Sequence, residues 1–412
     1  MSEPLDVVVV GAGAAGLAAA IFGARLKPGL RVAVLDGAAK VGAKILVSGG
    51  GRCNVTHETV GPADFWGGSP HVVRRILAAF PVERTVAFFK EIGVALHVEE
   101  RGKLFPDSNS ARTVLDALLA EARRLGVDLR SAHRVTAVAR RDGLFQLSTS
   151  GGELAARRIV LATGGLSLPK TGSDGGGYRL AASLGHTLVS TTPGLEPLLL
   201  EGDFHAALSG IAHPVEISVR VEGRKPVLLE GPMLWTHFGI SGPAALDASR
   251  HWQRGRVEGS AVTVTANLLP GNDFSSLEAK LLQLAQSQPR TNLRNTLSTL
   301  LPGKVAEAVL ARMKLRGDTT LANLSREDRR TLVKALLEWP LPVVGGRGYN
   351  FAEVTAGGVP LTEVDPSTLE SRPCPGLYFT GEILDVDGRL GGYNFQWAWS
   401  SAWVVASALA RA

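Results

Sequence analysis

Residues 7–20 read VVVVGAGAAGLAAA, and this stretch decides the fold. Four consecutive valines predict a strand buried on both faces, and the alanine-rich run after them predicts a helix. Gly11, Gly13 and Gly16 lie at the turn between them, with G-x-G-x-x-G spacing. In a dinucleotide-binding βαβ unit, these glycines allow a tight turn, a close approach to a pyrophosphate, and close packing of the helix on the strand. The helix N-terminus then points its free N–H groups at the phosphates.

An acidic residue follows at a distance that suits a ribose. The apolar run Arg31–Leu35 ends in Asp36, about 20 residues beyond the glycine turn, where a carboxylate holds ribose hydroxyls. An acid here favours a free 2′-hydroxyl, and so FAD or NAD over NADP. Glycine spacings also arise by chance in a chain with 48 glycines, so a βαβ unit that binds nothing is the alternative.

Composition sets the outer limits. The 412 residues, 45% of them hydrophobic and 20% charged, predict a globular protein of two or three domains. The net charge is +6, but the basic residues are scattered among acids without aromatic interleaving, which argues against a nucleic-acid partner. Cys53 and Cys374 form no C-x-x-C pair, so we expect a reducing compartment and no metal site. Without a basic leader or a run of about 18 apolar residues, we expect a cytoplasmic protein that does not enter membranes.

A second glycine-rich segment carries many hydrogen-bond donors. Lys44 precedes Ser48, three glycines that end in Gly51, and the sequence Arg52-Cys53-Asn54. Such a loop suits a second phosphate or the edge of a flavin ring. A plain surface loop is the alternative.

The order of the next elements favours FAD over NAD. Helical patterns cover 70–92 and 111–125, and strands are expected at 134–139 and 145–149 around an Asp142-Gly143 hairpin turn. The buried run 158–162 then leads into Ala-Thr-Gly-Gly. A meander followed by such a strand is the layout of glutathione-reductase-like FAD domains, whereas NAD dehydrogenases continue with βα repeats. No second G-x-G-x-x-G follows, so a permanent NAD(P)H domain is not expected.

The pattern predicts one domain interrupted by another. We expect an α/β fold: a Rossmann-like, glutathione-reductase-type FAD-binding domain with an inserted β domain and a helical subdomain. Alternating strands follow a change in composition, and leucines at helical spacing come next. The predicted boundaries are 1–190 for the first part of the FAD domain, 191–270 for the β domain, 271–340 for the helical subdomain, and 341–412 for the return to the β-domain edge and the FAD domain.

The C-terminal segment is expected beside the flavin. A short buried strand, 376–379, ends in Thr380-Gly381-Glu382, and Gly-Gly-Tyr-Asn at 391–394 opens a final helix through Ala410. The positive end of that helix suits the pyrimidine edge of a flavin, where negative charge collects on reduction. Trp399 and Trp403 are expected in the core.

Five phrases together resemble one family. They are KVGAKILVSGGGRCNVTH, RGKLFP, THFGISGP, VTAGGVPLTEVDPSTLESR and GLYFTGEILDVDGRLGGYNFQWAWSSAW. In this order they resemble the YhiN-like bacterial flavoproteins related to aminoacetone oxidase and to the bile-acid flavoprotein BaiN. The resemblance spans nearly the whole chain. It implies non-covalent FAD in a two-part domain, and an inserted domain that closes over the flavin.

The resemblance, together with the motifs above, gives a set of cofactor-binding residues. They are Gly11, Gly13, Ala14, Ala15, Gly16, Asp36, Gly37, Lys44, Ser48, Gly51, Arg52, Cys53, Asn54, Val135, Thr163, Gly164, Gly381, Glu382, Asp387, Gly392, Tyr393, Asn394 and Phe395. Leu390 and Ala402 depart from the family pattern, which leaves FAD binding intact and changes the pocket.

The predicted activity is hydride transfer between a small-molecule substrate, an amine or an activated C–H or C=C bond, and flavin N5. His237 is the candidate acid or base because histidine exchanges protons near neutral pH, and a packed core histidine is the alternative. Thr236 and Arg101 are candidates to polarise or anchor the substrate. Two further hypotheses are an NAD(P)H-dependent reductase of a conjugated double bond, with NAD(P)H as a transient donor, and an RNA-associated or non-enzymatic flavoprotein. Family membership leaves the substrate, the electron partner and the oligomeric state open.

Overall fold

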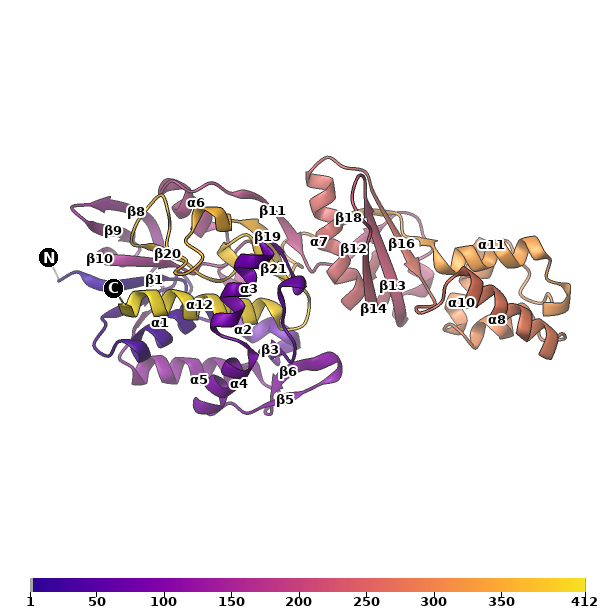
Figure 1. Ribbon diagram of the computed structural model, residues 1–412, viewed down its shortest axis with the longest axis horizontal. Helices are drawn as coiled ribbons and strands as arrows, with labels where there is room; N and C mark the ends of the chain where they lie inside the picture. The colour runs from indigo at the N-terminus through magenta and orange to yellow at the C-terminus, as the bar shows by residue number, and fades with distance from the viewer. Residues whose placement is uncertain (1–2, 412) are drawn as a thin grey trace. The chain divides into compact units, whose positions relative to one another are not determined.

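The computed structural model describes residues 3–411, and the chain divides into two compact units (Figure 1). The first unit combines the chain up to Pro193 with the chain from Tyr349 onward. The second unit is Gly194–Gly348. Each is described by itself below.

A seven-stranded sheet organises the first unit, in the order β7-β2-β1-β10-β9-β8, with β20 also paired to β10. Strands β7, β2, β1, β10 and β20 run parallel, while β9 and β8 form the antiparallel meander. Their bounds are β7 Asp128–Arg130, β2 Val32–Leu35, β1 Leu5–Val10, β10 Gly152–Leu161, β9 Leu144–Thr149, β8 Val135–Arg141 and β20 Leu377–Phe379. The predicted Rossmann-like fold is confirmed. Strand β10 begins at Gly152, earlier than the predicted buried run at 158, and its first half pairs antiparallel with β9.

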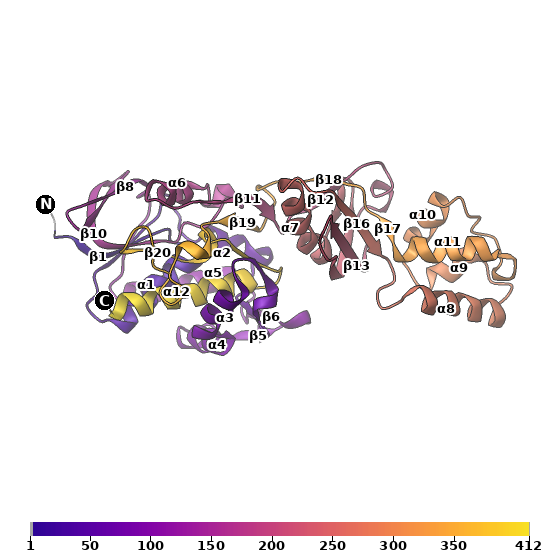
Figure 2. The same cartoon turned by 45° about the horizontal axis from the view of Figure 1, so that its top comes forward.

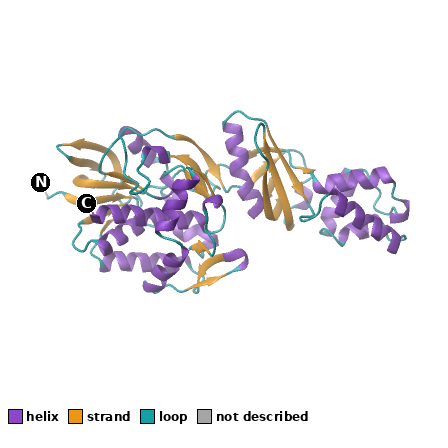
Figure 3. Cartoon of the chain, in the orientation of Figure 1, coloured by secondary structure: helices purple, strands orange, loops and turns teal. Residues whose placement is uncertain are grey.

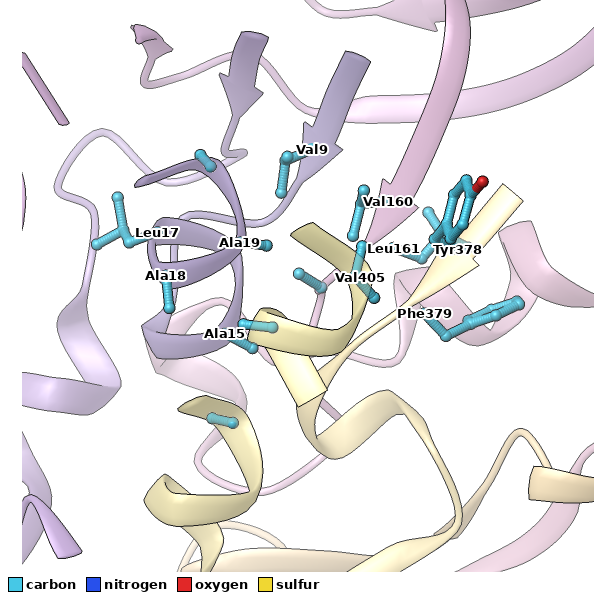
Figure 4. Packing of buried hydrophobic residues seen from close by; sticks show 14 of the residues in the cluster. Val9, Ala15, Leu17, Ala18, Ala19, Val160, Leu161, Tyr378, Phe379 and Val405 are labelled. Carbon is cyan, nitrogen blue, oxygen red and sulfur yellow. The ribbon is translucent and has the colours of Figure 1, made fainter. Parts of the chain in front are cut away.

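Two helices from opposite ends of the chain, α1 (Ala14–Leu26) and α12 (Tyr393–Arg411), pack together in the core of this unit. Figure 4 shows their side chains, among them Ala15 of α1 and Val405 of α12, beside those of the central strands. Small residues on α1 permit this close packing, because alanine adds little bulk beyond the backbone. Trp399 is fully buried, and Trp403 packs against Phe22, so both tryptophans belong to the core as expected.

The predicted helix over 70–92 is wrong in one respect, because it is two helices. Helix α3 ends at Ala79 and α4 begins at Val82. Pro81 lies between them; a proline has no N–H to donate and disfavours a helical conformation in the residue before it. The remaining elements of this unit are α2 Ala43–Val47, β3 Thr56–His57, β4 Phe65–Gly67, α3 Pro70–Ala79, α4 Val82–Glu91, β5 Leu96–Val98, β6 Lys103–Pro106, α5 Ala111–Arg124, α6 Gly176–Ser183, β11 Val189–Gly194, β19 Val354–Gly358 and β21 Val386–Gly388.

An antiparallel sheet forms the centre of the second unit, in the order β17-β16-β13-β14-β15-β12-β18. Its bounds are β17 Trp339–Pro340, β16 Val262–Asn267, β13 Ala212–Val221, β14 Val227–Thr236, β15 Gly239–Ser241, β12 Leu198–Leu200 and β18 Val343–Gly346. The alternating pattern predicts only strands over 191–270, whereas the structure also contains helix α7 (Pro243–Val257), which packs on β13 and β14. Proline at the first helical position is a start signal that the surrounding strand pattern concealed.

Four helices lie between β16 and β17 in the chain: α8 (Phe274–Ser287), α9 (Leu293–Ser298), α10 (Gly303–Arg312) and α11 (Arg326–Leu337). We call residues 274–337 the helical group. Figures 2 and 3 show it as a helical cluster next to the strands of this unit. Its buried leucines belong to the same apolar core as the sheet, which confirms the helical spacing of the leucines. No helix within residues 3–411 has the length and apolar character needed to cross a membrane.

Candidate FAD site

The three glycines of the opening turn are needed for different physical reasons. Gly11 has φ +107°, and a Cβ on it would lie 2.5 Å from the carbonyl oxygen of Ala162. A Cβ on Gly16 would lie 1.8 Å from the carbonyl oxygen of Gly11. A Cβ on Gly13, in contrast, would meet nothing within 4 Å. Two glycines are therefore fixed by packing, while the middle one borders open space, as expected of a turn that receives a pyrophosphate.

The N-terminus of α1 is free to bind an anion. The helix begins at Ala14 with Gly13 as its N-cap, no side chain caps it, and its first turn holds no acidic residue. The first N–H groups of a helix have no partner within the helix, and the helix dipole makes this end positive. Ala14 and Ala15 thus offer N–H groups without competing side-chain acceptors, which suits the two phosphates of FAD.

Asp36 is held at the end of β2 by two backbone donors. Its Oδ2 accepts from the Ala12 N–H at 2.7 Å, and its Oδ1 accepts from the Ala38 N–H at 2.8 Å. A carboxylate has about four acceptor positions, so two remain for ribose hydroxyls. A Cβ on the adjacent Gly37 would lie 3.1 Å from Cβ of Arg134, the residue before β8. The structure thus brings the predicted adenosine-binding residues of β2 and the start of β8 close together.

Lys44 and Glu382 are brought together from opposite ends of the chain. Lys44 Nζ lies 2.5 Å from Glu382 Oε2 and 2.5 Å from Ser167 Oγ. Glu382 Oε1 accepts from Ser167 Oγ at 2.8 Å and from the Thr355 N–H at 2.9 Å. Ser167 and Thr355 are completely buried. The network fixes a cation and a carboxylate inside the first unit.

Sequence reasoning did not place Ser167 and Thr355 among the site residues. Thr355 Oγ1 accepts from the N–H groups of Leu166 and Ser167, so it also holds the loop that follows β10. The available signal was the position of both residues in segments of small residues, Gly-Gly-Leu-Ser and Thr-Ala-Gly-Gly.

The donor-rich loop is strongly curved and its arginine is already engaged. Gly49, Gly50 and Gly51 have positive φ, and so has Cys53, with φ 62°. Arg52 donates to Glu99 at 2.5 Å and stacks over the Phe105 ring at 4.1 Å. This hydrogen bond holds the pKa of Glu99 below its usual value.

Neither cysteine is arranged for redox chemistry. Cys53 and Cys374 are both buried and both unpaired. Burial raises the pKa of the Cys53 thiol to about 12, against a weaker effect of its hydrogen bond with Ser48. Since the thiolate is the reactive form, this side chain is inert at neutral pH. Among the described residues no group of three or more histidine, cysteine or acidic side chains can hold a metal ion.

The loop also contributes an unused acceptor near the start of α12. Asn54 Oδ1 is buried and has no hydrogen-bond partner. A Cβ on Gly392, which has φ +96°, would lie 2.9 Å from this oxygen and 2.5 Å from the carbonyl oxygen of Thr56. Asn394 is engaged, since its amide donates to the carbonyl oxygen of Gly388 and accepts from the Gly388 N–H. Unpartnered buried acceptors are costly, so a ligand donor is expected here. The residues present therefore fit FAD: an anion site, a ribose acceptor and an acceptor for a ring N–H.

The other predicted cofactor residues are distributed around these groups. Tyr393 begins α12 and stacks on the ring of His57 at 4.8 Å. Phe395 stacks on Trp399, and Asp387 is almost fully buried in β21. Thr163 follows β10 closely, and a Cβ on Gly177 would collide with its hydroxyl. His57 was not predicted as a site residue, although it ends the quoted loop phrase.

The predicted catalytic residues lie in both units. Thr236 and His237 lie together at the β14–β15 hairpin of the second unit, where Thr236 pairs with Gly239. His237 is exposed and its ring contacts Phe238 edge-on, whereas Thr236 Oγ1 is buried and has no partner. Arg101 belongs to the first unit, in the turn between β5 and β6, where its φ is 63° and its carbonyl oxygen lies 2.5 Å from His57 Nε2. Joint action of the three residues stays a prediction.

Comparison with known proteins decides the family. The model of the HI0933-like protein Rossmann domain matches residues 5–408. The chain belongs to this family. It is therefore an oxidoreductase of the flavoprotein type with a Rossmann-type FAD-binding domain, which confirms the predicted family and fold.

Curated relatives extend along the whole chain. One, from Escherichia coli K12, is named ribosomal RNA dihydrouridine synthase. It is 38% identical to this chain, and the match covers all of this chain and 99% of the relative. A protein of the same name from Haemophilus influenzae is 37% identical over the full length of both chains. A third, from Clostridium scindens, is named 3-dehydro-bile acid delta(4,6)-reductase and is 35% identical over 98% of both chains.

Solved structures show the same fold at low identity. A quinol-fumarate reductase with menaquinol molecules matches with a TM-score of 0.52 and 16% identity, over 99% of this chain and 71% of that one. This similarity concerns the fold alone.

Proposed function

We propose that this protein is an FAD-dependent reductase that adds hydrogen across a carbon–carbon double bond conjugated to a carbonyl, and that its substrate is a uracil of ribosomal RNA. The named reactions of the relatives share this chemistry. Uracil becomes dihydrouracil when its C5–C6 double bond, conjugated to C4=O, is reduced, and the bile-acid relative is named for reduction at positions of the same kind. The full-length identity of 38% to an RNA-acting relative is the observation that carries the proposal.

The first unit supplies the cofactor cradle. In this proposal the turn at Gly13 and the N-terminus of α1 bind the pyrophosphate, and Asp36 binds the ribose. Lys44 is held in place by Glu382 and Ser167, so its position needs no rearrangement during turnover. Asn54 Oδ1 accepts from a ring N–H. Bound FAD would supply the two-electron carrier, whose N5 exchanges a hydride with the substrate carbon.

The second unit supplies the proton in this proposal. Reduction adds a hydride to the carbon β to the carbonyl and a proton to the α carbon. His237, exposed at its hairpin, donates the proton, and the unpartnered hydroxyl of Thr236 polarises the carbonyl oxygen. Arg101 anchors the anionic substrate.

Each turnover consumes two electrons, which we assign to a transiently bound NADH or NADPH. The cysteines argue against a dithiol donor within the chain, because both are buried and unpaired. The sequence contains no second dinucleotide fingerprint after a strand, so the nicotinamide would bind only to deliver its hydride.

The test uses flavin-loaded protein, NADH or NADPH, and a ribosomal RNA transcript made in vitro, under anaerobic conditions. We expect mass spectrometry of the digested RNA to find a uridine heavier by two hydrogen atoms. A reduced flavin that is reoxidised by a steroid dienone, with no change in the RNA, would instead support the small-molecule reductase, for which the bile-acid relative argues. Reduction of the flavin by an amine followed by reoxidation by O₂ would support an oxidase.

A further inference from the structure

The helical group has a charge balance unlike that of the chain as a whole. Its acids are Glu278, Glu307, Asp318, Glu327 and Asp328. Its lysines and arginines are more than twice as many: Lys280, Arg290, Arg294, Lys304, Arg312, Lys314, Arg316, Arg326, Arg329, Arg330 and Lys334. Eleven cations against five anions give this segment the same formal charge, +6, as all 412 residues together. The rest of the chain is therefore balanced.

Most of the acids in the helical group are already engaged. Glu278 lies 3.5 Å from Arg329, Glu307 lies 3.6 Å from Arg294, and Asp318 pairs with Arg316 at 2.8 Å. Asp328 accepts from Ser325 Oγ at the start of α11. Within residues 3–411 the other eight cations of the helical group form no ion pair, and all of them are exposed: Lys280, Arg290, Lys304, Arg312, Lys314, Arg326, Arg330 and Lys334.

Three of these cations form a ridge along α11. Arg326, Arg330 and Lys334 follow one another at intervals of four residues, which places them on one side of the helix at steps of about 6 Å. The buried side chains of this helix, Leu332, Val333 and Leu336, are packed into the core of the second unit. The ridge is exposed to solvent along more than two turns.

We propose that the helical group is the RNA-docking surface of this protein, with the α11 ridge at its centre. The inference rests on the proposed function, which supplies RNA as the partner, and adds where the phosphates bind. Eight unpaired cations on one small segment offer uncompensated positive charge, and Lys or Arg contacts to phosphates dominate nucleic-acid affinity.

The chemistry of the surface also predicts what it does not recognise. The aromatic side chain Phe274 is only half-buried, but Arg330 lies over its ring at 5.1 Å. Stacking on bases is therefore no main contribution, and contacts to phosphates position an RNA without reading its sequence. The surface gives affinity, and the choice of uracil is made elsewhere.

The test compares whole flavin-loaded proteins in binding to a ribosomal RNA transcript at salt concentrations from about 50 to 200 mM. The variant combines Arg326→Gln, Arg330→Gln and Lys334→Gln. We expect an affinity at least about tenfold weaker at the higher salt concentration, and a slope of log affinity against log salt that is smaller by about 2. A matched control combines Lys90→Gln, Arg112→Gln and Arg123→Gln, three exposed cations of the first unit to which the structure gives no ion pair, and it should bind nearly as tightly as the wild type.

Folding is controlled by flavin content, by circular dichroism, and by a variant with Arg326→Lys and Arg330→Lys, which keeps the charge and should keep the affinity. Equal affinity and equal slope for the α11 variant and the wild type would overturn the inference. So would binding of the wild type to phosphatidylglycerol vesicles but not to RNA. Because the readout is binding, RNA held through α11 without formation of dihydrouridine would defeat the proposed function alone, and dihydrouridine formed with unchanged affinity of the variant would defeat this inference alone.

Discussion

Charged side chains are used differently in the FAD-binding part of the first unit and in the helical group. Around the cofactor cradle three cations are paired: the predicted site residues Lys44 and Arg52 with Glu382 and Glu99, and Arg134, next to the predicted Val135, with Asp174. In the helical group eight cations have no ion-pair partner in the part of the chain that the structure describes. Paired charges fix side chains and thereby the shape of a site, whereas unpaired charges are left for a partner that brings the opposite sign.

If the proposed RNA docking holds, the same difference accounts for the absence of a nucleic-acid signal in the sequence. Arg326, Arg330 and Lys334 are separated by other residues, so the sequence contains no basic block. A helix brings such residues to one side, and the acids of the same segment are removed by pairing. The net charge of the whole chain contains no information on which cations share one side of a helix or which acids are paired.

The largest expected effect is on folding and FAD binding when valine replaces a glycine of the opening turn. The outcome should differ between a glycine that is fixed by packing and the one that borders open space. Gly16→Val places side-chain atoms where the carbonyl oxygen of Gly11 lies, and we expect no folded protein. Gly13→Val has no such obstacle, and we expect a folded protein whose FAD affinity falls more than about 100-fold, since a side chain now occupies the phosphate position. Circular dichroism and flavin titration measure the two outcomes. A yellow, stable Gly16→Val protein would refute the packing argument.

The next substitution is expected to lower catalysis and to leave cofactor binding unchanged. His237→Ala removes the proposed proton donor and leaves the first unit intact, so we expect full flavin content and a kcat lower by a factor of about 10² to 10⁴. His237→Gln should behave alike, because glutamine keeps a polar side chain but cannot act as a general acid near neutral pH. An unchanged kcat with the RNA substrate would remove His237 from the mechanism.

A smaller effect concerns the partly buried ion pair of Lys44 and Glu382, whose side chains are 27% and 17% exposed. Glu382→Gln leaves Lys44 without its anion, and we expect a loss of about 2 kcal/mol in the free energy of unfolding and weaker FAD binding. The control is Glu99→Gln, which breaks the more exposed pair with Arg52 and should hardly change the unfolding temperature. Equal effects of the two substitutions would show that the Lys44 pair is not special.

An effect of similar size depends on pH and disappears in acid. Hydrogen bonds from Arg124 and, more weakly, Arg25 outweigh burial and lower the pKa of Glu121 to about 2. Its stabilising contribution, about 2 kcal/mol, is present above the unfolded pKa near 4.3 and is lost as the pH falls toward 2. Thermal unfolding should find Glu121→Gln less stable than the wild type at pH 7, with the gap closing in acid. A gap that does not depend on pH would exclude this ion-pair explanation.

The sequence predicted the first unit better than the second for a physical reason. The valine run, the glycine turn and the Asp142-Gly143 hairpin are local patterns, and each formed the expected element. Helix α7 depends on the neighbouring strands on which it packs. The break between α3 and α4 depends on the single residue Pro81 within a periodic run. Ser167 and Thr355 meet Glu382 only through the fold, so no spacing could have revealed them.

We propose that RNA docking and the reduction of the substrate depend on different residues of this protein. The most direct measurement reduces the flavin of the whole protein, mixes it anaerobically with a ribosomal RNA transcript, and follows flavin absorbance at increasing RNA concentration. We predict that the α11 variant reaches the same rate constant as the wild type at saturating RNA but needs at least about tenfold more RNA to do so. A lower rate constant at saturation, with an unchanged half-saturating concentration, would contradict the account.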